Sequence, residues 1–359
     1  MKKNTLFHAI RLTFLIAILA VAHFSWAAIG DQFAKVEILQ PDKIQSGRVA
    51  FVDASIAKLI EVDLSGKITW EYSIPRVVLG NGKLTGGTDV EWLPMSDSFL
   101  LAIPGSGVFE ISRQGQVVWK YLTPYADHDA DRLENGNTVF VHGWDDDDAP
   151  IMTEVDVAGK ITYQLFARDL NLNLDERHQV TAEPYSNTHA NSVRKLGPNE
   201  YLLSLRNFNQ FVKIFNGKVV EKVKNARHVH DPVPYKDGYL LAVHLQDDRS
   251  ALLFHSGAGQ RLPFFKPEPG TWVRMRTVEL LQNGNILISG AREIGQLDSQ
   301  GQLVWTLTAD QFSAKNPARE LDYFSTKPHL FSNNTLPTAL DGLGAGARFW
   351  PEESPPPRP

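Results

Sequence analysis

Histidines and one arginine recur at matching places in three successive hairpins of this chain. Each predicted hairpin carries two of these residues at mirror-image positions about its turn. The three pairs are His128 with His142, His189 with Arg206, and His230 with His244. The first turn, Asn135-Gly136, is a strong hairpin signal because both residues accept positive φ. If the hairpins stack around one axis, the six side chains converge on one place.

Clustered imidazoles with a guanidinium, and without a compact set of carboxylates, suit two kinds of chemistry. Three imidazoles can hold Zn²⁺ or Cu²⁺. Alternatively, a histidine nucleophile can carry a transferred group while arginine binds the anionic oxygens of that group. In the second case we expect Arg206 to lower the pKa of the nucleophile and keep it unprotonated near neutral pH.

An internal repeat shows how the chain positions these hairpins. Each copy is a strand, a glycine turn and a second strand, usually ending in an aromatic residue. The copies begin at Glu61, Glu110, Glu154, Lys213 and Gln296, with a degenerate one near Ser256. An apolar hairpin precedes each copy, so the unit has four strands and occurs six times. The sequence therefore predicts an all-β fold, a six-bladed β-propeller over residues 30–335.

The ends of the propeller and its loops are less regular. Ring closure uses either the run from Phe33 to Leu39 or the run near Leu330. Almost no helix is expected, apart from short helices at 169–179 and 309–322. Residues 336–359 form a proline-rich tail.

The repeat places the polar residues on one face of the central channel. The start of each first strand and the end of each second strand lie together there. First strands begin at His128, His189, His230 and Arg276, and second strands end at His142, Arg206 and His244. His228 flanks this set. An alternative interpretation is that the histidines are structural and bond to a neighbouring blade. Arg274 and Arg276 either add positive charge to the channel mouth or pair with acids between blades.

Composition and the N-terminus limit the functional classes. The net charge of −5 gives no broad basic surface for nucleic acid. The chain has no cysteine, which excludes a cysteine nucleophile, a thiolate metal site and a disulfide. Residues 1–27 read as a signal peptide, with a basic start, a short apolar run and a small-x-small site. We therefore expect a periplasmic or secreted protein with no stable membrane span after cleavage; retention of the segment as an anchor is the alternative.

An acidic run, Asp145 to Asp148, follows His142. Carboxylates in such a run could bind Ca²⁺, and a solvated loop is the simpler interpretation. We expect no cofactor.

The order of the polar motifs resembles that of the bacterial arylsulfotransferases (aryl-sulfate sulfotransferases), which are six-bladed periplasmic propellers. The matching motifs are His128-Asp-Ala, Thr-His189-Ala-Asn-Ser-Val, Ser-Leu-Arg206-Asn and His230-Asp. The resemblance covers most of the propeller and is densest from His128 to His244. Members of the family also carry an N-terminal β-sandwich domain and a disulfide, so this chain resembles a diverged short member.

The resemblance implies a PAPS-independent transfer of a sulfuryl group from an aryl sulfate to a phenol. His230 corresponds to the histidine that becomes sulfated, with His228 as the competing choice. His128, His189 and Arg206 correspond to the supporting groups, and His142, His244, His228 and Arg276 are expected to line the substrate site. Two alternatives stay open: a metal-dependent hydrolase or lactonase, and a non-catalytic periplasmic scaffold or binding protein.

Overall fold

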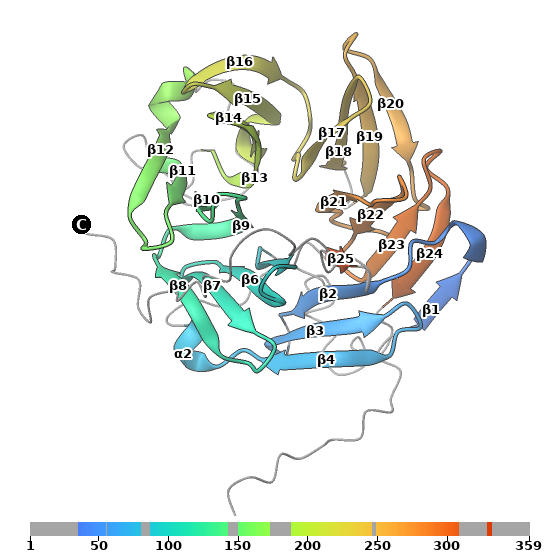
Figure 1. Cartoon of the computed structure of the whole chain (residues 1–359). Helices are drawn as coiled ribbons and strands as arrows, with labels where there is room; N and C mark the ends of the chain where they lie inside the picture. The colour runs from blue at the N-terminus through green and yellow to red at the C-terminus, as the bar shows by residue number, and fades with distance from the viewer. Residues whose placement is uncertain are drawn as a thin grey trace, which may run out of the picture. The chain divides into compact units, whose positions relative to one another are not determined.

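The computed structural model consists of six antiparallel sheets that form a six-bladed β-propeller (Figure 1). It describes residues 35–54, 56–79, 87–142, 150–172, 188–245, 249–308 and 329–331. The predicted fold class is therefore confirmed. The predicted signal peptide, the 336–359 tail, the acidic run Asp145 to Asp148 and the predicted helix at 309–322 lie outside the described residues.

The strands follow the four-strand unit that the repeat predicts. Blade 1 contains β25 (His329–Phe331), β2 (Arg48–Asp53), β3 (Lys58–Asp63) and β4 (Ile68–Ser73), and blade 2 contains β5 (Asp89–Leu93), β6 (Ser98–Ile103), β7 (Gly107–Ser112) and β8 (Val117–Leu122). Blade 3 contains β9 (Ala126–Arg132), β10 (Thr138–His142), β11 (Pro150–Val155) and β12 (Ile161–Phe166), and blade 4 contains β13 (Ala190–Gly197), β14 (Glu200–Leu205), β15 (Gln210–Phe215) and β16 (Lys218–Val223). Blade 5 contains β17 (Pro232–Tyr235), β18 (Gly238–His244), β19 (Ser250–Ser256) and β20 (Arg261–Phe265), and blade 6 contains β21 (Thr277–Leu280), β22 (Ile286–Ser289), β23 (Glu293–Leu297), β24 (Leu303–Thr308) and the added edge strand β1 (Lys35–Ile38).

Both candidate segments take part in closing the ring. β1, from the N-terminal run, pairs antiparallel with the outer strand β24 of blade 6. β25, from the C-terminal run, pairs with β2 at the inner edge of blade 1. The described helical segments are short: α2 (Arg76–Leu79) and the 3-10 turns η1 (Pro41–Lys43), η2 (Ala167–Leu170) and η4 (Arg206–Phe208). The helix predicted at 169–179 overlaps only η2 within the described residues.

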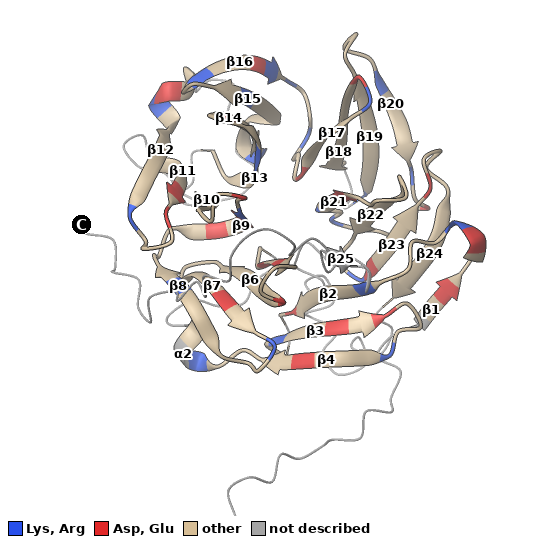
Figure 2. Ribbon diagram, viewed as in Figure 1, with Lys and Arg blue, Asp and Glu red and all other residues tan. Residues whose placement is uncertain are grey.

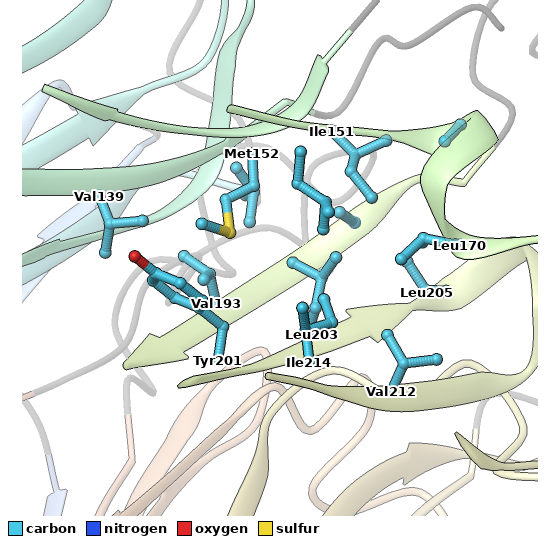
Figure 3. Packing of buried hydrophobic residues seen from close by; sticks show 14 of the residues in the cluster. Val139, Ile151, Met152, Leu170, Val193, Tyr201, Leu203, Leu205, Val212 and Ile214 are labelled. Atoms are coloured by element: carbon cyan, nitrogen blue, oxygen red, sulfur yellow. The ribbon is translucent and has the colours of Figure 1, made fainter. Parts of the chain in front are cut away.

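The second strand of each blade packs on both faces, which explains its near-continuous apolar sequence. Every residue of β6, β10 and β22 is buried. Figure 3 shows one such core, in which Met152 of blade 3 packs near Leu203 and Ile214 of blade 4. The blades are therefore joined by apolar packing from side to side.

The last aromatic residue of the repeat also joins neighbouring blades. The indole Nε1–H of Trp70 donates to the carbonyl of Arg113 at 3.0 Å, and that of Trp119 donates to Val157 at 3.0 Å. Trp305 of blade 6 donates to Leu64 of blade 1 at 2.9 Å, which ties the last blade to the first. The recurring tryptophan of the sequence is thus a bridge between blades.

The acidic residue that begins the repeat makes a second bridge; Figure 2 marks acidic positions on β3, β7 and β11 in red. Glu61 of β3 pairs with Arg113 of blade 2. Glu110 of β7 pairs with Arg132 of blade 3 at 2.9 Å, and Glu154 of β11 pairs with Lys195 of blade 4 at 2.9 Å. These ion pairs repeat from blade to blade, as expected for a structural role.

Candidate functional site

His128, His189 and Arg206 form one cluster at the start of β9 and β13. The Nε2 atoms of His128 and His189 lie 2.9 Å apart, although 61 residues separate them. Arg206 Nη1 lies 2.9 Å from the same Nε2 atom of His189. Arg206 follows β14, and its backbone N–H donates to the carbonyl of His189. The hairpin therefore sets this pair opposite each other, as the sequence predicts.

The donors of this cluster suit an anion better than a cation. A guanidinium only donates hydrogen bonds, and an imidazole nitrogen has at most one lone pair. Arg206 Nη1 and His128 Nε2 both approach the one Nε2 atom of His189. An oxyanion among the three groups would accept from Arg206, and from each imidazole that is protonated on the nitrogen facing it. The guanidinium charge would oppose a metal cation at the same place.

His230, His244 and His228 form a second cluster on blade 5. The rings of His230 and His244 stack with centroids 4.1 Å apart, and the ring of His228 lies 6.2 Å from that of His244. His230 Nδ1 lies 2.7 Å from the carbonyl oxygen of His228. A carbonyl only accepts, so we assign the proton of neutral His230 to Nδ1 and the lone pair to Nε2. His244 Nε2 donates to the carbonyl of Met275 at 3.0 Å in the same way.

Burial and positive charge lower the pKa of two histidines of the second cluster, His230 and His244. Burial lowers the pKa of His230 well below the ordinary value, and His244, Arg276 and Arg206 lower it further. The pKa of His244 is also well below its ordinary value, first because of burial and then because of Arg276. Arg206 acts on the pKa of both imidazoles, so its charge links the two clusters. The predicted direction for His230 is confirmed, with burial as the largest cause.

Two site histidines have a strained backbone. His189 has φ of 47° and His228 has φ of 43°. Positive φ is uncommon for a residue with a side chain and persists only where the surroundings enforce it. Such strain is frequent at binding and catalytic sites.

His142 lies apart from these clusters, in an aromatic pocket. Its Nε2 atom lies 2.9 Å from Thr153 Oγ1, and its ring stacks between Tyr125 and Phe140. Burial lowers its pKa from 6.5 to about 4. His142 lies opposite Ala126 in the β9–β10 pair, because a bulge interrupts the register after Phe140. His128 and His142, predicted to lie nearly opposite each other, are therefore two residues out of register in this strand pair.

Three groups next to the histidines were not predicted from the hairpin pattern of the sequence. Asp127 Oδ1 lies 2.8 Å from His128 Nδ1, Thr153 contacts His142, and Met275 offers its carbonyl to His244. Asp127 stands next to His128 in the sequence, but neighbouring residues of a regular strand point to opposite faces. Only the bulge in β9 brings the two side chains together.

A set of carboxylates occupies the positions that follow the channel residues in the inner strands. We call Asp89, Asp129 and Asp231 the aspartate ring, and His128, His189 and His230 the histidine ring. Each aspartate accepts a backbone N–H from the next blade. The bonds are Ala130 to Asp89 at 3.3 Å, Val193 to Asp129 at 2.7 Å and Val278 to Asp231 at 3.0 Å.

A cleft of about 1030 Å³ lies between blades 3 and 4, at the other end of β9 and β13 from the histidines. Glu91, Asp131 and Arg194 are among the residues that line it. Burial raises the pKa of Glu91 well above its ordinary value, and the charge of Asp131 raises it further. The cleft has none of the predicted site residues.

Two properties of the described residues bear on the predicted partners. Within the described ranges, no group of three or more His, Cys, Asp or Glu is placed to hold a metal ion. In the same part of the chain, no helix has the length and apolar character needed to cross a membrane.

Comparisons with known proteins support the fold alone. No family model and no curated protein matches the chain. A protein of unknown function from Bacteroides caccae superposes with a TM-score of 0.53 at 16% identity, over 79% of this chain and 99% of its own. The WD40 β-propeller domain of Doa1 gives 0.50 at 14% identity, over 78% and 83% of the two chains. Virginiamycin B lyase from Staphylococcus aureus, in an inactive form with quinupristin, gives 0.49 at 14%, over 78% and 90%. Neither the Doa1 domain nor the lyase is an arylsulfotransferase, and the function of the first protein is not established.

Proposed function

We propose that the protein transfers a sulfuryl group from an aryl sulfate to a phenol through a sulfated histidine. The observation that carries this proposal is the convergence of His128 Nε2 and Arg206 Nη1 on His189 Nε2. With both imidazoles protonated, these groups form a donor set for anionic oxygens. His230, which supplies an available lone pair, lies within electrostatic reach of Arg206.

In the first half-reaction, Nε2 of neutral His230 attacks the sulfur atom of the aryl sulfate. The S–N bond forms as the bond between sulfur and the aryl oxygen breaks. Arg206 and protonated His189 stabilise the sulfuryl oxygens, where each charge-assisted donor is worth about 2–4 kcal/mol. His128 gives a proton to the departing phenolate.

In the second half-reaction, His128 takes the proton of the incoming phenol, whose oxygen attacks the same sulfur atom. The S–N bond breaks, and His230 returns to its neutral form. The cycle is ping-pong and uses no nucleotide. A low pKa of His230 favours this chemistry because the imidazole must be unprotonated at each attack.

An exposed aromatic ring supports an aryl group as part of the substrate. Tyr125 lies three residues before His128 and is 49% exposed. Its ring is parallel to that of His142, with centroids 5.8 Å apart and an interplanar angle of 10°. The other face of Tyr125 can extend this stack with an aryl ring.

The alternatives are a metal-dependent hydrolase or lactonase and a non-catalytic binding or scaffold protein, and the contact of Arg206 with His189 disfavours a metal site there. We place the activity in the periplasm or outside the cell, because residues 1–27 read as an export signal.

The direct test mixes the purified protein with 4-nitrophenyl sulfate and phenol. We expect nitrophenol release that depends on phenol, and an acid-labile sulfated peptide that contains His230. His255→Ala is the matched control, since His255 lies on β19 of the same blade and is part of neither cluster; it should retain both signals. Absence of phenol-dependent release and of the sulfated peptide would contradict the proposal.

A further inference from the structure

The residue before His128 contributes a buried carboxylate to the site. Asp127 is only 2% exposed, and its Oδ1 atom lies 2.8 Å from Nδ1 of His128. This is a contact of charge with the ring edge, without hydrogen-bond geometry, because Nδ1 has no hydrogen-bond partner among the described residues. The opposite edge of the same ring places Nε2 at 2.9 Å from His189. Asp127, His128 and His189 therefore form a continuous row of polar groups.

A β-bulge creates this row. Ala130 pairs with Phe140 and Ala126 pairs with His142, so residues 127–129 lie opposite Val141 alone. A bulge of this kind re-aims side chains that would otherwise alternate between the two faces. Without it, the carboxylate and the imidazole would point in opposite directions.

The backbone of blade 2 fixes the ring from a second side. A Cβ atom built on Gly87 would lie 1.8 Å from Nδ1 and 2.2 Å from Cε1 of His128. The glycine backbone thus packs directly on the edge of the ring that faces Asp127. Any larger residue at position 87 must displace the imidazole.

We propose that Asp127 is a positioning residue, which holds the His128 proton on Nδ1 and directs Nε2 toward the reacting oxygen. An orienting carboxylate selects the tautomer of an imidazole and fixes its ring. Nε2 is then the atom that exchanges a proton with the phenol. The catalytic part of this inference rests on the proposed sulfotransfer, whereas the tautomer does not.

The test combines histidine tautomers with kinetics. Protein labelled with ¹⁵N-histidine is studied by long-range ¹H–¹⁵N correlation, with His128→Gln to assign the signal. In the wild type we expect neutral His128 to carry its proton on Nδ1. Asp127→Asn should change this tautomer and lower kcat about 10- to 100-fold with little change in KM.

Two variants control for charge and for position. Asp131→Asn removes a carboxylate from the same strand and should leave the tautomer of His128 unchanged. Gly87→Ala keeps every charge and should lower kcat by displacing the ring. A further readout is His142: the charge of Asp127 raises its pKa, so Asp127→Asn should lower that pKa below about 4.

The outcomes separate this inference from the proposed function. A proton on Nε2 of His128 in the wild type would overturn the positioning role without any variant. An Asp127→Asn protein with the wild-type tautomer and kcat would also overturn it. An Nδ1 proton lost in Asp127→Asn, in a protein that never turns over aryl sulfates, would support the positioning role and contradict sulfotransfer.

Discussion

The histidine ring and the aspartate ring occupy neighbouring positions on the inner strands, yet they meet different surroundings. Each aspartate accepts a backbone N–H from the next blade, so its hydrogen bond joins two blades. In the histidine ring, His128 and His189 instead meet each other, and His189 also meets Arg206. Bringing donors together does not stabilise the fold, which is typical of a site arranged for a ligand. The same strands thus carry a structural position and, next to it, the position to which we assign the proposed function.

The largest effect is expected from His230→Ala. Removal of the nucleophile should lower kcat for 4-nitrophenyl sulfate by about 1000-fold or more, as for other covalent catalysts. The melting temperature should also fall, because the variant leaves a cavity beside His244 and removes the hydrogen-bond donor to the His228 carbonyl, so turnover is compared per folded molecule. Steady-state kinetics and thermal unfolding of the same preparation measure both. Retained turnover would show that His230 is not the nucleophile.

The next largest effect is the pH dependence that His142 gives to the free energy of unfolding. Its pKa is lowered from 6.5 in the unfolded chain to about 4 in the fold, so the unfolded chain binds more protons between these values. Stability is therefore full above pH 6.5 and declines as the pH falls toward 4, by about 3 kcal/mol for this residue. Urea unfolding at pH 7.5 and 4.5 should show a smaller decline for His142→Gln than for the wild type. Equal declines would contradict the assignment.

A stability effect without loss of chemistry is expected from Asp231→Ala. The variant leaves the backbone N–H of Val278 without its acceptor. It also removes the ion pair between Asp231 and Arg194. The free energy of unfolding should fall by about 2–3 kcal/mol, while turnover per folded molecule is retained. Asp237→Ala, in an exposed turn of the same blade, should change stability little. If Asp231→Ala removed turnover with unchanged stability, the structural role of the aspartate ring would be contradicted.

The smallest effect is a shift in the pH profile. Arg276 lowers the pKa of His230, so Arg276→Gln should raise that pKa toward its ordinary value. The acid limb of kcat/KM then moves to higher pH, by about 0.5–1 unit. Arg227→Gln removes an exposed charge near His228 and should leave the limb in place. If the acid limb of kcat/KM does not move in Arg276→Gln, Arg276 does not influence the pKa of the group that controls turnover.

The blade order was predictable because the repeat records local requirements. A glycine turn, an apolar second strand and a terminal tryptophan each leave a pattern in nearby residues, and the six blades follow from counting them. The grouping of His189 with Arg206 was predictable for the same reason, since a tight hairpin sets their register. The roles of these residues in catalysis stay predictions.

The partners of the site were not predictable, because they depend on register and on contacts between blades. Two bulges change the pairing where the histidines lie: one in β9 at residues 127–129, and one in β13 between Ala190 and Val193. A mirror-image count across a turn cannot detect an extra residue in one strand. It therefore placed His142 opposite His128 and overlooked Asp127.

By itself, the sequence determined the repeating unit, the fold class and the residue types at the channel mouth, because these depend on short-range periodicity. The tertiary structure decided which imidazoles touch, which nitrogen keeps its lone pair and which charges reach His230. Those properties arise where separate blades meet, at distances of a few ångströms between residues as far apart in the chain as His128 and His189.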